Sequence, residues 1–227
     1  MLFDLDGTLF DYEASEAAAV AATLEEAGTP STDEVVALYR EVNARHWRAL
    51  ERGETTAAEL RLARWAEVFE TVGSAPTLDV AALAERYLEH LAAGTHLVAD
   101  AEAVLEELSA THAIAFITNG LADVQRPRLA SSPVGRFAEV VVISDEVGAA
   151  KPDGAIFDAA FAAMGSPPRD DVVLVGDSVT ADVAGGIAYG LTTVWFDPAG
   201  LGPVPDGGPQ PTHRISRLRE LPPLLRR

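Results

Sequence analysis

Two aspartates stand near the start of the sequence, in the stretch Asp4-Leu5-Asp6-Gly7-Thr8-Leu9, directly after an apolar run. Apolar residues followed by carboxylates and a glycine turn predict a strand whose carboxyl end bears both acidic groups. Two carboxylates at one sheet edge need either a cation or a division of labour between nucleophile and proton carrier. The stretch predicts a reactive centre, although Asp before Gly also occurs in ordinary turns. Because position 1 lies so close to Asp4, we expect the first strand to be incomplete.

The composition of the 227 residues is that of a globular protein, with 48% hydrophobic and 23% charged residues. The formal charge of -18 argues against nucleic acid polymers and anionic membranes as partners. Cysteine is absent, which excludes disulfides and thiolate metal sites. No apolar run approaches the roughly 20 residues of a membrane-spanning helix. We therefore expect a cytoplasmic protein, monomeric or homodimeric, that acts on a small molecule.

The pattern of the chain changes near residue 97. Residues 12–96 contain helical patterns only, with apolar stripes that recur at helical spacing. These stripes consist of Val80, Leu83, Ala84, Tyr87, Leu88 and Leu91, and of Leu62, Trp65, Phe69 and Val72. After residue 97, helices predicted at 102–109, 122–130, 155–164 and 181–189 alternate with strands predicted at 113–117, 140–143, 172–175 and 192–196. Residues 198–211 are predicted to be a loop, and 215–225 a short strand or turn followed by a helix.

Short runs rich in β-branched residues, separated by helices, indicate a parallel sheet that is covered on both faces. The predicted fold class is therefore α/β, a doubly wound, Rossmann-like parallel sheet with an inserted all-helical domain. We expect a catalytic core of residues 1–11 and 97–227 and a helical cap of residues 12–96. Ligands of such sheets bind beyond the carboxyl ends of the strands. Because the insertion leaves from the loop after the first strand, we expect it to act as a lid over that site.

Three further motifs fall at strand ends or at the start of the following helix. They are Thr118-Asn119-Gly120, Lys151-Pro152, and Gly176-Asp177-Ser178 with Asp182 shortly after it. Each is ordinary by itself, as a strand-to-turn transition, a surface lysine or a turn. Together with Asp4 and Asp6, however, they gather carboxylates and a lysine at one sheet edge. Such a set suits a hard divalent cation with oxygen ligands, Mg²⁺, and an anionic substrate.

This residue set can support phosphoryl transfer. A carboxylate can attack phosphorus, while a second carboxylate protonates the leaving group and then activates water. The cation and the lysine would neutralise charge on the phosphoryl oxygens. The hydroxyl and free N–H groups of Thr118-Asn119-Gly120 can hold phosphate oxygens. The expected partner is a small phosphorylated metabolite.

The four motifs, in this order on alternating strands and helices, resemble those of the haloacid dehalogenase-like hydrolase superfamily. The resemblance covers nearly the whole chain. It implies that Asp4 is the nucleophile and Asp6 the general acid and base. It implies that Thr118 and the N–H of Asn119 bind the phosphoryl group, and that Lys151 steadies Asp4 and the phosphate. The implied magnesium ligands are Asp4, the backbone carbonyl of Asp6, Asp177 and, in or next to that shell, Asp182.

The helical insertion narrows the resemblance. The segments Glu41-Val42-Asn43 with Trp47, Arg52-Gly53-Glu54-Thr55-Thr56 and Arg64-Trp65 resemble the noncanonical pyrimidine 5′-nucleotidase branch, whose substrates are nucleoside 5′-monophosphates. Tyr39, Asn43 and Trp47 share one helical face, which suits stacking and hydrogen bonding to a base. We therefore predict Asn43 and Trp47 as substrate-binding residues. Packing inside the cap is the alternative for the same face.

Other functions use the same core. A phosphoglycolate or sugar-phosphate phosphatase is the alternative enzyme, because only the cap would differ. A 2-haloacid dehalogenase is less well matched, since those enzymes carry a non-acidic residue where Asp6 stands and need no metal. A non-catalytic binding module would be expected to lack one of Asp4, Asp6, Lys151 and Asp177, and all four are present.

Overall fold

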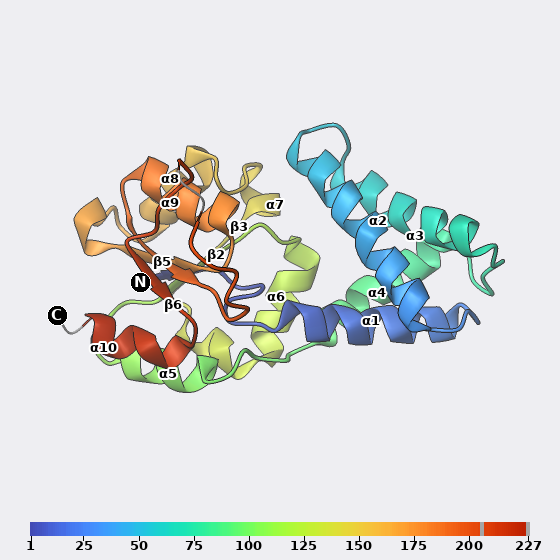
Figure 1. Ribbon diagram of the computed structural model, residues 1–227, viewed down its shortest axis with the longest axis horizontal. Helices are drawn as coiled ribbons and strands as arrows, with labels where there is room; N and C mark the ends of the chain where they lie inside the picture. Colours follow the sequence, from blue (N-terminus) through green and yellow to red (C-terminus); the bar gives the residue numbers. More distant parts are fainter. Residues whose placement is uncertain (205–206, 226–227) are drawn as a thin grey trace. The chain divides into compact units, whose positions relative to one another are not determined.

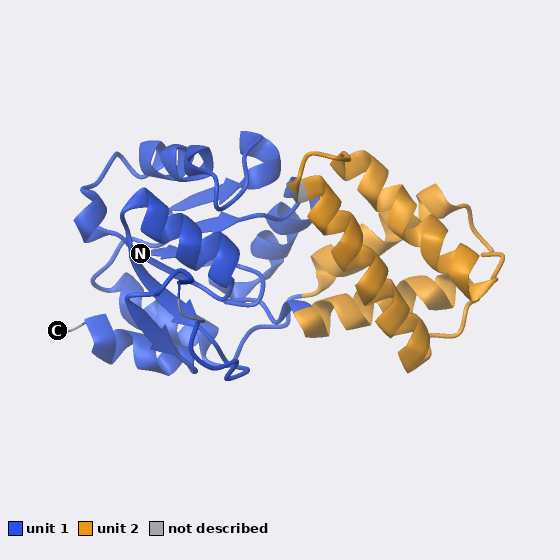
Figure 2. Ribbon diagram, turned by 45° about the horizontal axis from the view of Figure 1, so that its top comes forward, with its two compact units in different colours: residues 1–12, 95–227 blue, residues 13–94 orange. Residues whose placement is uncertain are grey.

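The computed structural model describes residues 1–204 and 207–225, and the chain divides into two compact units. Unit 1 contains Met1–Tyr12 together with Thr95–Arg227, and unit 2 contains Glu13–Gly94 (Figure 2). Unit 1 contains the sheet, whereas unit 2 contains helices only. A segment leaving unit 1 shortly after the first strand therefore forms unit 2 and then returns.

Unit 1 is built around a six-stranded sheet in the order β3-β2-β1-β4-β5-β6, in which all neighbouring strands are parallel. The strands are β1 (Leu2–Phe3), β2 (Ala115–Thr118), β3 (Val140–Ile143), β4 (Val173–Gly176), β5 (Thr192–Phe196) and β6 (His213–Ile215). The four strands predicted after residue 97 are all present, with small shifts at their ends. The predicted doubly wound α/β fold is confirmed.

In the four strands β2, β1, β4 and β5, alternating side chains are mostly buried on both faces of the sheet, as crossover helices require. Leu2 and Leu174 pack with residues of α8 (Gly154–Ala163) on one face. Their neighbours Phe3 and Val175 pack with residues of α5 (Ala101–Ser109) and, further along the chain, of α10 (Leu221–Leu225) on the other. Figure 1 shows α8 and α9 (Ala184–Tyr189) on one side of the sheet and α5 and α10 on the other. β1 is thereby fixed at the centre of the core.

The remaining helical segments of unit 1 refine the sequence predictions. They are α6 (Ala122–Ser131), α7 (Ser144–Val147), the 3-10 turns η1 (Pro133–Phe137), η2 (Arg169–Asp171) and η4 (Leu218–Glu220), and η3 (Val179–Val183). The helix predicted around 181–189 is present, but its first residues belong to the π-helical turn η3, and the α-helix α9 begins at Ala184. The N–H of Ser178, the residue before η3, donates to Oδ2 of Asp182 within the turn over 3.0 Å. This hydrogen bond fixes the Asp182 carboxylate at the start of the turn. Turns of this kind often occur at functional sites.

Unit 2 contains four helices, α1 (Tyr12–Glu26, whose first residue is in unit 1), α2 (Asp33–Glu51), α3 (Ala57–Val72) and α4 (Val80–Ala93). The apolar stripe predicted for 80–91 is largely buried. The stripe predicted for α3 is wrong at both ends, because Leu62 and Val72 are exposed. The buried face instead includes Leu60, Arg64 and Val68. The periodicity of apolar residues could not reveal a buried arginine as part of this face.

Candidate active site

The register of the sheet brings the predicted motifs to one edge. Asp4 directly follows β1, and its N–H donates to the Val175 carbonyl on β4 over 2.9 Å. Thr118 is the last residue of β2, and Asp177 directly follows β4. Because β1 pairs in parallel with both β2 and β4, these three strand ends lie at the same edge of the sheet.

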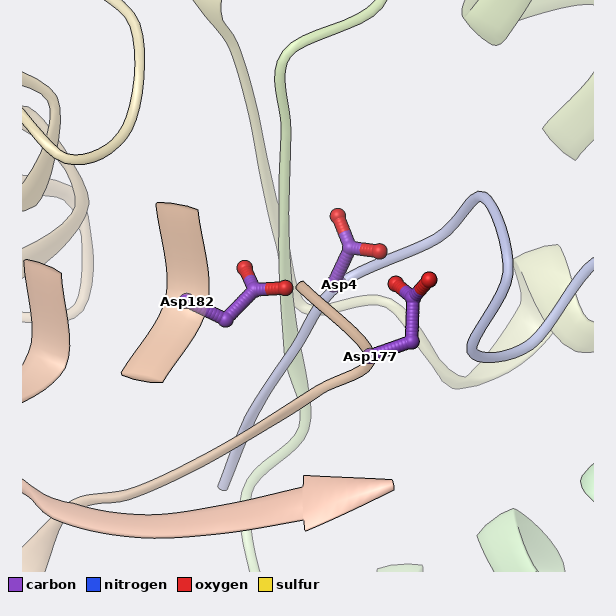
Figure 3. A group of neighbouring side chains, drawn as sticks. All are labelled: Asp4, Asp177 and Asp182. Carbon is purple, nitrogen blue, oxygen red and sulfur yellow. The ribbon is translucent and has the colours of Figure 1, made fainter. Parts of the chain in front are cut away.

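Three carboxylates converge there. Asp4, Asp177 and Asp182 each offer one oxygen atom, and these atoms lie within 4.8 Å of one another (Figure 3). Burial raises the pKa of Asp4 well above its ordinary value, and the charges of Asp182 and Asp177 raise it further against the opposing effect of Lys151. Burial and then the charge of Asp182 raise the pKa of Asp177 to about 6. The cluster therefore holds more negative charge than its surroundings stabilise.

Lys151 supplies the positive charge within this cluster. Its Nζ donates to Asp4 Oδ1 over 2.5 Å, to Asp182 Oδ1 over 2.6 Å and to the Ile117 carbonyl over 3.2 Å. Burial acts to lower the pKa of Lys151, but the charges of Asp182 and Asp4 and the hydrogen bonds to them outweigh burial and raise it. The ammonium group therefore remains charged and links the two buried aspartates.

Asn119 holds the backbone of Lys151 rather than its side chain. The Asn119 Oδ1 accepts from the Lys151 N–H over 2.7 Å, and its Nδ2 donates to the Lys151 carbonyl over 2.9 Å. Both polar ends of the amide therefore bind the backbone of one residue, through the two peptide units on either side of its Cα. The asparagine that follows β2 therefore fixes the position of the lysine that precedes α8, although the two residues are far apart in the sequence.

Two glycines allow the aspartates to approach the backbone. A Cβ added at Gly7, which has a φ of +82°, would lie 2.4 Å from Asp177 Oδ2. A Cβ added at Gly176 would lie 2.2 Å from the Asp182 carboxyl carbon. Real Cβ atoms do not come this close to other atoms, so both motif glycines are needed for the carboxylates to reach their positions.

Asp6 lies at the same edge, with partners that the sequence patterns did not indicate. Gln125 Nε2 donates to Asp6 Oδ2 over 2.5 Å, and Arg128 forms an ion pair with Asp6 Oδ1. Gln125 Nε2 also donates to Thr118 Oγ1 over 3.2 Å. The only sequence feature that points to these partners is the spacing of Gln125 and Arg128, three positions apart on the helix that follows Thr118-Asn119-Gly120.

Unit 2 contains the two predicted base-reading residues, Asn43 and Trp47. Asn43 is buried, its Nδ2 donates to Glu16 Oε1, and its Oδ1 accepts from Arg64 Nη1, each over 3.0 Å. Its amide thus takes part in a polar network inside the helical unit, as the packing alternative requires. Trp47 is half-buried. Contact of either residue with a substrate stays a prediction.

The donor set at the sheet edge suits a magnesium ion. Asp4, Asp177 and Asp182 supply the oxygen ligands that hard cations prefer. The three carboxylates together with Lys151 leave two negative charges when all four groups are ionised, which a divalent cation would balance. The raised pKa values of Asp4 and Asp177 show that this excess charge is not stabilised by the protein alone.

Comparisons with known proteins place the chain in a family. The model of the haloacid dehalogenase-like hydrolase family matches residues 1–190. The HAD-hydrolase YfnB of Bacillus subtilis is 31% identical, over 97% of this chain and 92% of that protein. The pyrimidine 5′-nucleotidase YjjG of Escherichia coli is 31% identical, over 99% of this chain and 96% of YjjG. The chain belongs to the haloacid dehalogenase-like hydrolase family.

Solved structures agree with this assignment. The crystal structure of magnesium-bound YfnB from Bacillus subtilis superposes on this structure with a TM-score of 0.89. The match covers 99% of this chain and 96% of the YfnB chain. A 2-haloacid dehalogenase from Pseudomonas syringae is 26% identical, with a TM-score of 0.70 over 99% of this chain and 96% of its own. The expectation of a hydrolase in this family, with nucleotidases and phosphatases among its relatives, is confirmed. In the part of the chain that the structure describes, no helix has the length and apolar character needed to cross a membrane.

Proposed function

We propose that the protein is a magnesium-dependent phosphomonoester hydrolase that forms a covalent phosphoryl intermediate on Asp4. The observation that carries the proposal is the buried contact of Lys151 with both Asp4 and Asp182, next to Asp177. Asp4, Asp177, Asp182 and the backbone carbonyl of Asp6 would hold the cation. When bound, Mg²⁺ would neutralise negative charge on the substrate phosphate and on the ligand carboxylates.

The chain's own residues account for the remaining steps. An Asp4 oxygen attacks phosphorus, and the bond from phosphorus to the leaving oxygen breaks as Asp6 gives that oxygen a proton. Asp6 then takes a proton from water, whose oxygen attacks the same phosphorus and releases phosphate and the Asp4 carboxylate. Thr118 and the N–H of Asn119 would bind phosphoryl oxygens, and the Lys151 ammonium would offset their charge.

The environment of Asp6 favours a phosphatase over a dehalogenase. A halide leaves carbon without needing a proton, whereas an alkoxide leaving phosphorus does need one. Here an acidic residue stands at the proton-carrier position and is held by two side-chain donors. A dehalogenase would have no use for that arrangement.

Unit 2 is proposed to act as a cap, and a pyrimidine nucleoside 5′-monophosphate is the proposed substrate. The cap assignment is supported by the point of insertion, shortly after Asp4 and Asp6 at the carboxyl end of β1. The substrate is supported by the nucleotidases PynA of Streptococcus pneumoniae, 29% identical over 97% of this chain and 92% of PynA, and YjjG. The ribulose-1,5-bisphosphate 5-phosphatase of Halopiger xanaduensis, 33% identical over 88% of this chain and 84% of that protein, supports the sugar-phosphate alternative.

The nucleophile is tested with p-nitrophenyl phosphate. We expect hydrolysis that requires Mg²⁺ and falls to background in Asp4→Asn, because an amide cannot attack phosphorus. Asp170→Asn, which changes an exposed aspartate, is the matched control and should keep full activity. Full turnover by Asp4→Asn, or hydrolysis of chloroacetate without metal, would overturn the proposed chemistry.

The substrate is tested with a panel of UMP, dUMP, dTMP, sugar phosphates and phosphoglycolate. A preference in kcat/KM for the pyrimidine nucleotides would support the proposed branch. A preference for sugar phosphates or phosphoglycolate would retain the chemistry and replace the substrate.

A further inference from the structure

We propose that Gln125 and Arg128 of α6 are positioning residues that hold Asp6, and Gln125 also Thr118, in the orientation needed for proton transfer. This inference rests on the proposed function, because it gives Asp6 the role of proton carrier. It concerns two residues that no motif of the sequence includes.

Both oxygens of the Asp6 carboxylate have a donor from α6. Arg128 binds Oδ1, and Gln125 Nε2 donates to Oδ2 over 2.5 Å. Gln125 and Arg128 lie three positions apart, so they project from the same face of the helix. Their side chains are almost completely buried, whereas the side chain of Asp6 is 28% exposed. Asp6 therefore faces solvent on one side and a fixed pair of donors on the other.

Gln125 links the proton carrier to the phosphate-binding hydroxyl. Thr118 Oγ1 accepts from Gln125 Nε2 over 3.2 Å and from the Gly120 N–H over 3.1 Å. A hydroxyl oxygen has two lone pairs and one proton. With both lone pairs engaged, the hydroxyl proton is available to a phosphoryl oxygen. One amide group thus orients two groups of the proposed site.

Neighbouring residues hold the Gln125 amide and the Arg128 guanidinium in place. A Cβ added at Gly120 would lie 2.4 Å from Gln125 Nε2, so the glycine makes room for the amide. The Arg128 guanidinium lies 4.1 Å from the centroid of the Phe10 ring, which replaces water on that side. A buried arginine is costly without such partners, and its charge is directed at Asp6. Side chains locked in this way are what a reactive group requires for accurate placement.

The experiment is a double-mutant cycle between Arg128→Met and Asp6→Asn, with Arg126→Met as control. Arg126 lies on the same helix but is exposed and paired with Glu146. We expect Arg128→Met to lower kcat/KM for an alkyl phosphate by about 10²-fold, as misplacement of a reacting group does. In the Asp6→Asn background it should cause no further loss. An equal loss in both backgrounds would show that Arg128 acts structurally and would overturn the inference.

The leaving group provides a second readout that a structural role would not change. p-Nitrophenolate leaves without a proton, and kcat/KM reports steps only up to formation of the Asp4 intermediate. Arg128→Met and Gln125→Ala should therefore reduce kcat/KM for p-nitrophenyl phosphate less than for the alkyl phosphate, and Arg126→Met should affect neither. Equal reductions for both substrates would count against positioning of Asp6. If Asp6→Asn itself retained full activity on the alkyl phosphate, the proposed function would fail instead.

Discussion

Lys151 is the only lysine in the chain, and it is buried between two carboxylates. An ammonium in this position is held by its partners and also compensates their charge. The ion pairs stabilise the fold only while all three groups are present, because removing one member of a buried ionic group leaves the charges of the others without compensation. Lys151 therefore contributes both to the proposed chemistry and to the stability of the sheet edge.

Replacement of Lys151 by methionine tests this double role. We expect Lys151→Met to lower the free energy of unfolding of the metal-free protein at neutral pH by about 3 to 5 kcal/mol. Urea unfolding measures the change. The control is Arg136→Met, which removes an exposed ion pair with Glu102 and should change stability by less than about 1 kcal/mol. Equal effects of both substitutions would contradict a special role for Lys151.

The Asp177 carboxyl gives a prediction about pH. Burial and the charge of Asp182 raise its pKa to about 6, compared with roughly 3.9 in an unfolded chain. Between these values the folded protein binds more protons than the unfolded chain. The contribution of Asp177 to stability is therefore greatest below about pH 4 and declines as the pH rises through about 6.

The measurement compares metal-free wild type with Asp177→Asn, whose amide does not titrate. In EDTA, the stability of wild type relative to the variant should fall by up to about 3 kcal/mol between pH 4 and 6.5, since each pKa unit corresponds to about 1.4 kcal/mol. Adding Mg²⁺ should reverse the decline, because the cation binds the ionised carboxylates. A difference that rose with pH would contradict the assignment.

At the scale of elements, α9 packs closely on the sheet because its first turn contains small residues. A Cβ added at Gly186 would lie 2.6 Å from Thr193 Cγ2 and 2.9 Å from Leu174 Cδ2. The helix follows directly on η3, the turn that holds Asp182. The close packing of α9 against β4 and β5 therefore also fixes the position of Asp182 relative to the carboxyl ends of the strands.

Gly186→Ala tests this close packing. We expect a loss of about 1 to 3 kcal/mol, because the buried side chains of Thr193 and Leu174 would have to move to accommodate a methyl group. Gly154→Ala is the matched control, since a Cβ at Gly154 meets no atom within 4 Å. The free energy of unfolding of this variant should be unchanged or slightly higher than that of wild type. Thermal or urea unfolding of the two variants measures the contrast. A neutral Gly186→Ala would show that α9 can move without cost.

At the scale of the whole molecule, unit 1 is interrupted shortly after β1 and the proposed nucleophile that follows it. Residues 13–94 form a separate compact unit with its own aromatic core, in which the Tyr39 and Trp65 rings lie 4.8 Å apart. From the sequence we expect the boundaries at residues 11–12 and 96–97, and the compact units of the structure meet at 12–13 and 94–95. The small difference has no consequence for the site, because every core motif lies in unit 1.

The sequence by itself determined the family, the alternation of strands and helices, and the residues that meet at the sheet edge. It could do so because carboxyl ends of parallel strands meet at one edge, so that Asp4, Thr118 and Asp177 are brought together by topology alone. The position of Asn43 within a buried network and the outward face of Leu62 were decided by packing among helices. Helical periodicity reports the spacing of apolar residues, but not which polar side chain is buried beside them.

The tertiary structure alone decided that Gln125 and Arg128 bind Asp6. These residues are separated from Asp6 by more than one hundred positions, and they resemble ordinary polar residues of a surface helix. Their burial depends on where α6 lies after the chain has returned to the sheet. Only folding brings a guanidinium and an amide within hydrogen-bonding distance of that carboxylate, since the energy of such contacts depends on distances that no local pattern specifies.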